Sequence, residues 1–260
     1  MTDDLIHDLY GEPRPDPHAQ ARVWRRVTAR RRRRRLSWLA IPAVAAALTA
    51  FLLLTTGVGD QPLSGRSILL TAASSAASST SGGTYWHVRK LRDGAGASEL
   101  WVTRQGEAWT AEQGRVTRVT GRAPFSMAGR DLTYEQISAL PSDAAALRER
   151  VAAMLPPGSD GLLADALSGL LWTKPSAPGV RAAAYRALAD LPEVRYLGAA
   201  TDARGRAGEA FAFDLPSGGR RTLIIDPDSS QVLSCADSGH GGRSEVVLSA
   251  GWTDQGPDLP

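Results

Sequence analysis

Three residues near the C-terminus have side chains that could take part in nucleophilic catalysis. Cys235, Asp237 and His240 lie close together in the segment Cys-Ala-Asp-Ser-Gly-His-Gly-Gly. A thiolate beside an imidazole can form a nucleophile and base pair. A Cys nucleophile and its base normally meet through the fold, however, and no family signature surrounds this Cys. Because Gly and Ser dominate the segment, we predict a loop here, while a triad assembled by the fold would be invisible in the sequence.

Metal and cofactor chemistry find no support in the residue spacing. His7, His18, His87 and His240 have none of the spacings known for metal ligands, such as H-E-x-x-H. The chain also lacks a G-x-S-x-G elbow, a G-x-x-x-x-G-K phosphate loop and a G-x-G-x-x-G turn followed by a helix. We therefore predict no catalytic residue, no metal, no cofactor and a function that is not enzymatic.

Three tryptophans could instead contribute to binding. Trp86, Trp101 and Trp109 fall in successive expected strands. Aromatic side chains bury large areas, so these three could line a ligand groove. The alternative is that they belong to the sheet core or pair across strands, as aromatic residues generally do.

A long uncharged segment follows a run of arginines near the N-terminus. Residues 36–58 carry no charged side chain, and as a helix they would extend about 34 Å, enough to cross a hydrocarbon core of about 30 Å. We predict a transmembrane helix over 36–58, with Trp38 at its interface. Anionic lipid headgroups are expected to contact the six preceding residues, Arg30, Arg31, Arg32, Arg33, Arg34 and Arg35.

The orientation follows from the charge on either side of this segment. Residues 1–35 contain ten Arg and five Asp or Glu, a net charge of +5, whereas residues 36–260 contain twenty Lys or Arg and twenty-two Asp or Glu, a net charge of −2. Because positive flanks resist translocation, we predict a single-pass protein of the cell membrane with a cytoplasmic tail over 1–35. A cleaved signal peptide is the alternative, but its apolar core is usually shorter and ends at a small-residue site. No aromatic and basic fold surrounds the Arg run, so nucleic acid is not an expected partner.

The remainder of the chain is long enough for one globular domain outside the cytoplasm. Residues 59–83 form either a linker or a short helix, since Ile68, Leu69, Ala72, Ala73 and Ala76 recur at helical spacing. The predicted domain covers 84–260. Its only cysteine, Cys235, cannot form an internal disulfide, so packing alone must hold the fold.

The pattern of elements predicts an α+β fold. Strands are expected at 85–91, 99–104, 107–111 and 115–120, and again at 194–200, 208–214, 220–225, 231–234 and 245–252. Between the two groups, three helices are expected: one beginning near Ser142 and Asp143, one near Ser159 and Asp160, and one after Pro178. Strands, then helices, then strands indicate an antiparallel sheet packed against about three helices.

Several short segments resemble an uncharacterised actinobacterial family of single-pass membrane proteins. They are the Arg30 to Arg35 run with its apolar neighbour, Leu140-Pro141-Ser142-Asp143, the segment from Tyr185 to Pro192, and Ile225-Asp226-Pro227. The family implies no activity. More remotely, the order of elements is similar to the half-barrel of envelope lipoprotein carriers and of regulators that sense lipidated proteins, which implies a concave apolar cradle.

Two functional hypotheses follow. The first is a membrane-anchored, extracytoplasmic binding module, not catalytic, for an apolar ligand or an envelope protein. The second is a transmembrane regulator whose tail contacts a cytosolic partner such as a sigma factor, although residues 1–35 lack paired His and Cys zinc ligands. The shape of the exported domain distinguishes these functions. A wide apolar cavity favours carriage of a ligand, convergent polar side chains in a cleft favour catalysis, and a solid core favours contact with another protein.

Overall fold

The computed structural model describes residues 64–92, 96–156, 159, 161–216, 218–239 and 242–259. The chain divides into two units, Met1–Gly59 and Asp60–Pro260, and the described residues all belong to the second. Within them, every helix is too short or too polar to cross a bilayer. The expected cytoplasmic tail and the expected transmembrane helix at 36–58 both lie outside the described residues.

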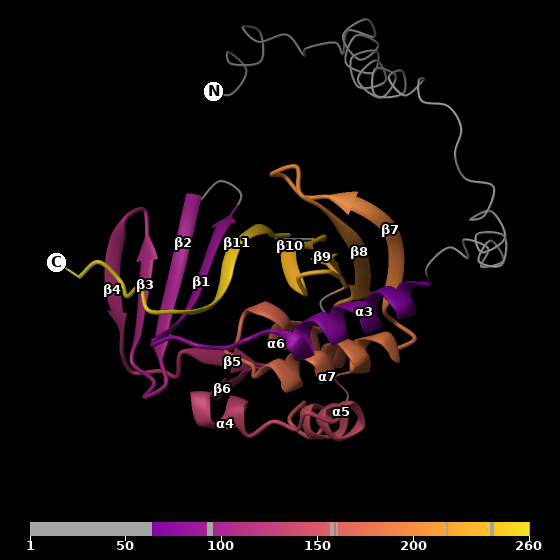
Figure 1. Ribbon diagram of the computed structural model, residues 1–260, viewed down its shortest axis with the longest axis horizontal. Helices are drawn as coiled ribbons and strands as arrows, with labels where there is room; N and C mark the ends of the chain where they lie inside the picture. Colours follow the sequence, from indigo (N-terminus) through magenta and orange to yellow (C-terminus); the bar gives the residue numbers. More distant parts are fainter. Residues whose placement is uncertain are drawn as a thin grey trace, which may run out of the picture. The chain divides into compact units, whose positions relative to one another are not determined.

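Nine strands form one antiparallel sheet, and helices pack against one side of it (Figure 1). The strands of this sheet are β1 (Tyr85–Arg92), β2 (Gly96–Thr103), β3 (Ala108–Glu112), β4 (Arg115–Val119), β7 (Arg195–Thr201), β8 (Ala207–Asp214), β9 (Arg220–Asp226), β10 (Gln231–Asp237) and β11 (Ser244–Thr253). A separate hairpin consists of β5 (Phe125–Met127) and β6 (Arg130–Leu132). The helices are α3 (Gly65–Ser78), α4 (Tyr134–Ser138), α5 (Ala144–Ala152), α6 (Leu162–Trp172) and α7 (Pro178–Ala189).

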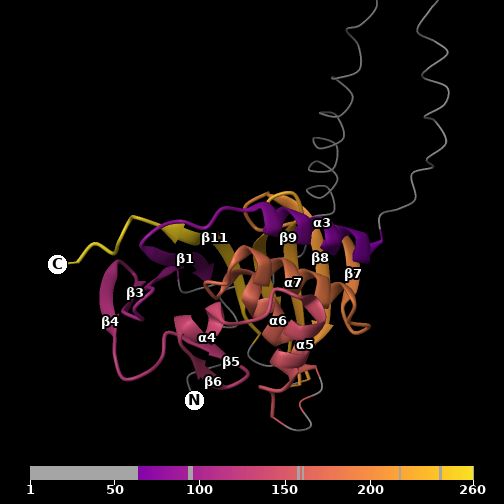
Figure 2. The same cartoon turned by 60° about the horizontal axis from the view of Figure 1, so that its bottom comes forward.

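The strand order joins the two ends of the described chain at the centre of the sheet. The order is β4-β3-β2-β1-β11-β10-β9-β8-β7, so the first strand pairs with the last. Tyr85 lies opposite Thr253 and Arg92 opposite Glu245, with one register shift between them. The β5–β6 hairpin and helices α4 to α7 connect the two outer strands, β4 and β7, and the curved sheet wraps around α6 and α7 (Figures 1 and 2).

Local sequence signals explain where the middle helices begin. Asp143 caps α5 by accepting a hydrogen bond from the Ala146 amide at 2.9 Å, and Pro178 occupies the first turn of α7. Proline fits that position because its missing N–H would have no partner there. The expectation of an α+β fold with an antiparallel sheet is confirmed, and the three expected helices correspond to α5, α6 and α7.

Helix α3 packs on the domain through the side chains whose spacing indicated a helix. Its buried residues are Ile68, Leu69, Ala72, Ala73 and Ala76, and they face α7. Small alanine side chains allow the two helices to lie close together. Ser64 caps α3 by accepting from the Ser67 amide at 3.2 Å. The folded unit therefore begins before residue 84, where we had placed its start.

Three short elements and more than one strand boundary differ from the expectation. No prediction covered β5, β6 or α4, because three to five residues are too few to show a period. Strand β10 continues to Asp237, so the predicted Gly/Ser loop was wrong for 235–237. Cys235 pairs with Leu223 on one side and Glu245 on the other. Pairing with β9 and β11 therefore continues β10 to Asp237, although its residues there are small.

Candidate functional site

A charged cleft of about 440 Å³ opens between α6, the β5–β6 hairpin and the inner face of β9 and β10. Its charged lining comes from three cationic side chains, Lys174, Arg221 and Arg243, and one carboxylate, Asp165. Asp237 lies beside them and brings a second carboxylate. The cations therefore exceed the carboxylates by one.

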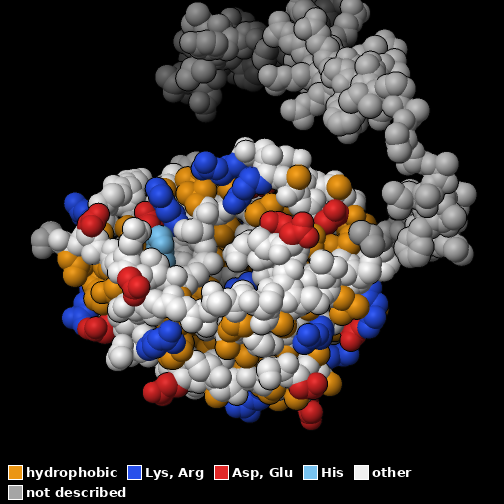
Figure 3. Space-filling model, viewed as in Figure 1, with side chains coloured by type: hydrophobic (Ala, Val, Ile, Leu, Met, Phe, Trp, Pro, Cys, Tyr) orange, Lys and Arg blue, Asp and Glu red, His pale blue; other side chains and the backbone are white. Residues whose placement is uncertain are grey.

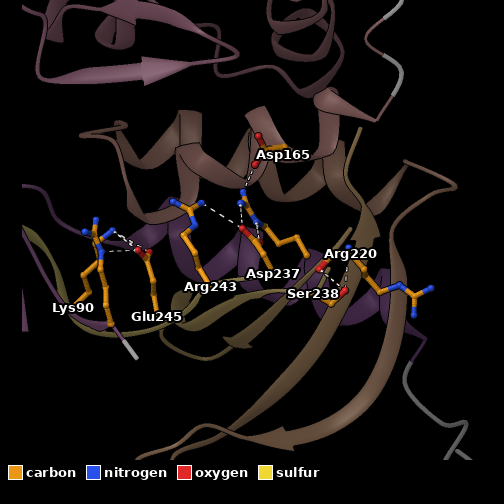
Figure 4. A network of polar contacts seen from close by, with 9 residues as sticks. Lys90, Asp165, Arg220, Asp237, Ser238, Arg243 and Glu245 are labelled. Carbon is orange, nitrogen blue, oxygen red and sulfur yellow. Dashed lines mark hydrogen bonds and ion pairs between the residues drawn. The ribbon is translucent and has the colours of Figure 1, made fainter. Parts of the chain in front are cut away.

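Arg221 is the centre of the ion-pair network in this cleft, and Figure 4 labels its partners Asp165 and Asp237. Its Nε and Nη2 donate to the two oxygens of Asp237 at 2.6 and 2.8 Å, and its Nη1 contacts Asp165 on α6. Arg243 also reaches Asp237, at 3.3 Å. These bonds raise the pKa of Arg221 and lower that of Asp237, although burial opposes both shifts. The network links α6 to the sheet. The guanidinium of Arg221 is already engaged by two carboxylates.

Lys174 is the buried cation of the cleft and has a different environment. Its side chain is 6% exposed, and within the described part of the chain its ammonium has no carboxylate within 4 Å. It donates to Thr173 Oγ1 at 3.1 Å. Burial lowers the pKa of Lys174 to about 8, and the positive charge of Arg221 acts in the same direction, while Asp165 opposes it.

A second ion-pair network lies beside the cleft and joins β1 to β11. Glu245 accepts from Lys90 Nζ at 2.9 and 3.0 Å and from Arg92 Nε at 3.0 Å. The ammonium of Lys90 also lies 5.5 Å from the centre of the Trp172 ring, which lines the cleft. On the face seen in Figure 3, charged side chains of both signs are spread among apolar ones.

The candidate nucleophile group does not form a catalytic arrangement in the described residues. Cys235 is buried in β10, and burial raises its pKa to about 12, so its thiol stays protonated at neutral pH. Asp237 is held by Arg221 and Arg243. His240 lies outside the described residues. A low thiolate population removes the main requirement for a Cys nucleophile.

The structure separates one of the three tryptophans from the other two. Trp86 points to the buried inner face of β1, where it packs edge-on against Trp252 at 6.1 Å between ring centroids. Trp101 and Trp109 are cross-strand partners, and Trp101 stacks on His87 at 4.7 Å. Since His87 follows Trp86 in the strand, it lies on the opposite face. The three indole rings therefore do not line one groove.

A larger hollow of about 770 Å³ lies between the end of α5, the start of α6 and the end of β8. Seven of its lining residues are apolar: Ala152, Ala153, Leu155, Pro156, Leu163, Leu215 and Pro216. Its polar lining includes Glu193 and Asp214. This volume is within the range of about 300 to 1,000 Å³ that is usual for small-molecule sites. Sequence reasoning missed both hollows, because their walls come from segments far apart in the chain.

The described residues do not contain a group of three His, Cys, Asp or Glu side chains arranged to hold a metal ion.

Comparison with known proteins does not identify a family for this chain. No protein-family model matches the chain, and no curated protein sequence does. Among solved structures, LprF from Mycobacterium bovis is similar with a TM-score of 0.31 and 12% identity, over 74% of this chain and 96% of that one. A likeness at that TM-score supports no conclusion about function, and the resemblance to an actinobacterial family stays a prediction.

Proposed function

We propose that this chain is a membrane-anchored binding module that acts outside the cytoplasm, without catalysis, on a ligand with an apolar part. The observation that carries the proposal is the hollow of about 770 Å³ whose lining is mostly apolar. Ligand sites typically combine apolar walls with a few placed polar groups. Glu193 and Asp214 supply such groups at this hollow.

Two further features support binding over catalysis. The thiol of Cys235 is protonated because of its burial, and the carboxylates of the charged cleft are engaged by arginines. A general base needs a free lone pair within reach of substrate. Side chains fixed in ion pairs are better suited to hold a ligand in place than to exchange protons with it.

The membrane anchor is the part of the proposal that comes from the sequence. Residues 36–58 are uncharged and follow the Arg30 to Arg35 run. A segment of that length and polarity is sufficient to span a bilayer with the basic end inside. The module would then sit beside the membrane, where apolar ligands are concentrated.

Native mass spectrometry of the full chain, extracted from membranes in a mild detergent, tests the binding function. We expect a bound small molecule at close to one per chain, which organic solvent extracts. Ala153→Trp should fill the hollow and lower this occupancy at least fivefold, because Ala153 is an exposed lining residue. Ala77→Trp, at an exposed position of α3, is the matched control and should keep the ligand.

Two results would contradict the proposal. One is a chain that carries no small molecule from its native membranes under conditions that preserve the fold. The other is equal occupancy in Ala153→Trp and the wild type, which would place the ligand elsewhere.

A further inference from the structure

We propose that the charged cleft is an anion site, in which the ammonium of Lys174 binds a phosphate, sulfate or carboxylate group. This inference rests on the proposed binding function and adds the chemical class of a group that the ligand carries. The site is distinct from the apolar hollow, which has no lining residue in common with the cleft.

The first argument is that Lys174 lines the cleft and has a single hydrogen-bond acceptor among the described residues. An ammonium has three N–H donors and no acceptor. Among the described residues one acceptor is in place, Thr173 Oγ1 at 3.1 Å. Lys174 lines the cleft although its side chain is 6% exposed. A buried cation at the wall of a hollow, with two further N–H donors to satisfy, is complementary to an anion.

The second argument is that helix α6 makes room for this ammonium. A Cβ atom at Gly169 would lie 2.6 Å from Lys174 Nζ, so a side chain there would require the flexible end of this lysine to move from its position. Glycine is unfavourable inside a helix relative to alanine. The absence of a side chain at Gly169 therefore has a local consequence, which is that the ammonium can lie against the helix backbone at the cleft wall.

The third argument is the charge around Lys174. Asp165 is the nearest carboxylate in the cleft, but Arg221 on β9 already engages it. The buried Cys235 on β10 is uncharged, because burial raises its pKa to about 12. Arg243, whose side chain is 64% exposed, adds a second cation at the cleft mouth. Although Arg243 also reaches Asp237, the three cations of the cleft outnumber its two carboxylates, so an incoming anion would meet one uncompensated positive charge.

The lowered pKa of Lys174 gives this site a pH signature. Its pKa is about 8 because burial removes water from the ammonium, so the cation is present below about pH 8 and lost above it. An anion that binds the ammonium should raise this pKa. Sulfate is the suitable probe because, unlike phosphate, it does not change protonation near neutral pH.

The chain offers a direct spectroscopic readout, because Lys90 and Lys174 are its only lysines. In full-length protein labelled with [13Cε]-lysine, two side-chain signals are expected. We expect sulfate to shift the Lys174 signal and to raise its titration midpoint above 8, while the Lys90 signal, whose ammonium is bound to Glu245, stays in place. Sulfate affinity should fall about tenfold per pH unit above pH 8.

Variants separate this site from general attraction of anions. Lys174→Met should weaken sulfate binding at least tenfold. Lys174→Arg should bind sulfate without the loss above pH 8, since guanidinium stays charged. Arg115→Met removes one exposed cation on β4 and should change affinity less than twofold. A folded wild type whose Lys174 signal is unmoved by sulfate and by inorganic phosphate overturns the anion site.

The anion could be a lipid headgroup or a free anion, and an experiment with lipid micelles distinguishes the two. Micelles containing phosphatidylglycerol should shift the Lys174 signal beyond the effect of inorganic phosphate if a lipid headgroup is the natural occupant. An equal response to phosphate alone, with phosphatidylcholine as the blank, would assign a free anion. If the chain keeps its apolar ligand while Lys174 ignores all three probes, the binding function stands and the anion site alone is wrong.

Discussion

At the scale of single residues, Lys174 should make the stability of the domain depend on pH. Burial lowers its pKa to about 8 in the folded state from 10.5, so between these values the unfolded chain binds more protons and stability rises with pH. The buried ammonium costs on the order of 3 kcal/mol below pH 8. Lys174→Met should therefore be more stable than the wild type at pH 7, with the difference shrinking toward pH 10.

Urea unfolding at a series of pH values measures this effect. Lys90→Met is a useful comparison, because it removes one of the two cationic partners of the buried Glu245 and should instead destabilise at pH 7. If Lys174→Met were less stable than the wild type at pH 7, the ammonium would have a partner strong enough to offset its burial.

Cys235 should be an unreactive thiol in the folded protein. Burial raises its pKa to about 12 from 9.0, which lowers the thiolate fraction at pH 8 by roughly 1000-fold. Iodoacetamide labelling at pH 8 should be slower by a similar factor in the native state than in urea. Rapid native labelling would reopen the possibility of a nucleophilic role for Cys235.

At the scale of elements, α3 should be part of the folded domain and not a tether. Leu69 is 2% exposed in the interface between α3 and α7. Leu69→Ala should lower the free energy of unfolding by about 2 to 5 kcal/mol, the usual cost of such a cavity. Thr71→Ala, on the exposed side of α3, should change it by less than about 0.5 kcal/mol. Equal stability of both variants in urea would support the linker alternative for 59–83.

Element positions also explain how the networks arise. β10 carries Cys235 and Asp237, β9 carries Arg221, and α6 carries Asp165. The pairing of β9 with β10 places Arg221 opposite Asp237, which is the register of their ion pair. Helix α6 packs on β10, and its Asp165 reaches Arg221 of β9.

At the scale of the whole molecule, the prediction concerns topology. If 36–58 spans the membrane, six residues, 59–64, connect it to α3 and reach at most about 22 Å. The domain would then lie against the outer surface of the membrane. Protease added to intact spheroplasts should remove the C-terminal domain and leave a short membrane fragment with the Arg run. Protection of the domain, or its release with a new N-terminus near residue 58, would refute the anchor.

Much of the fold could be predicted from the sequence, because the patterns that indicate strands and helix starts are local. Short segments rich in aromatic and β-branched residues predict the strands of the main sheet, and caps such as Asp143 and Pro178 predict the helix starts, because these signals act over a few residues. The helical spacing of the apolar residues from Ile68 to Ala76 likewise indicated which side chains of α3 are buried. The uncharged segment 36–58 and its basic flank remain the sequence's own evidence for an anchor.

The tertiary structure alone decided which side chains meet. Lys174 and Arg221 line one cleft only because the fold brings α6 and β9, which are far apart in the chain, together. Alternation along β1 separated Trp86 from Trp101 and Trp109, although all three fall in strands. The side chain of a residue is set by its sequence, but its burial, its partners and hence its pKa depend on the whole fold. For that reason Cys235 looked reactive in the sequence, and Lys174 became notable only once its surroundings were known.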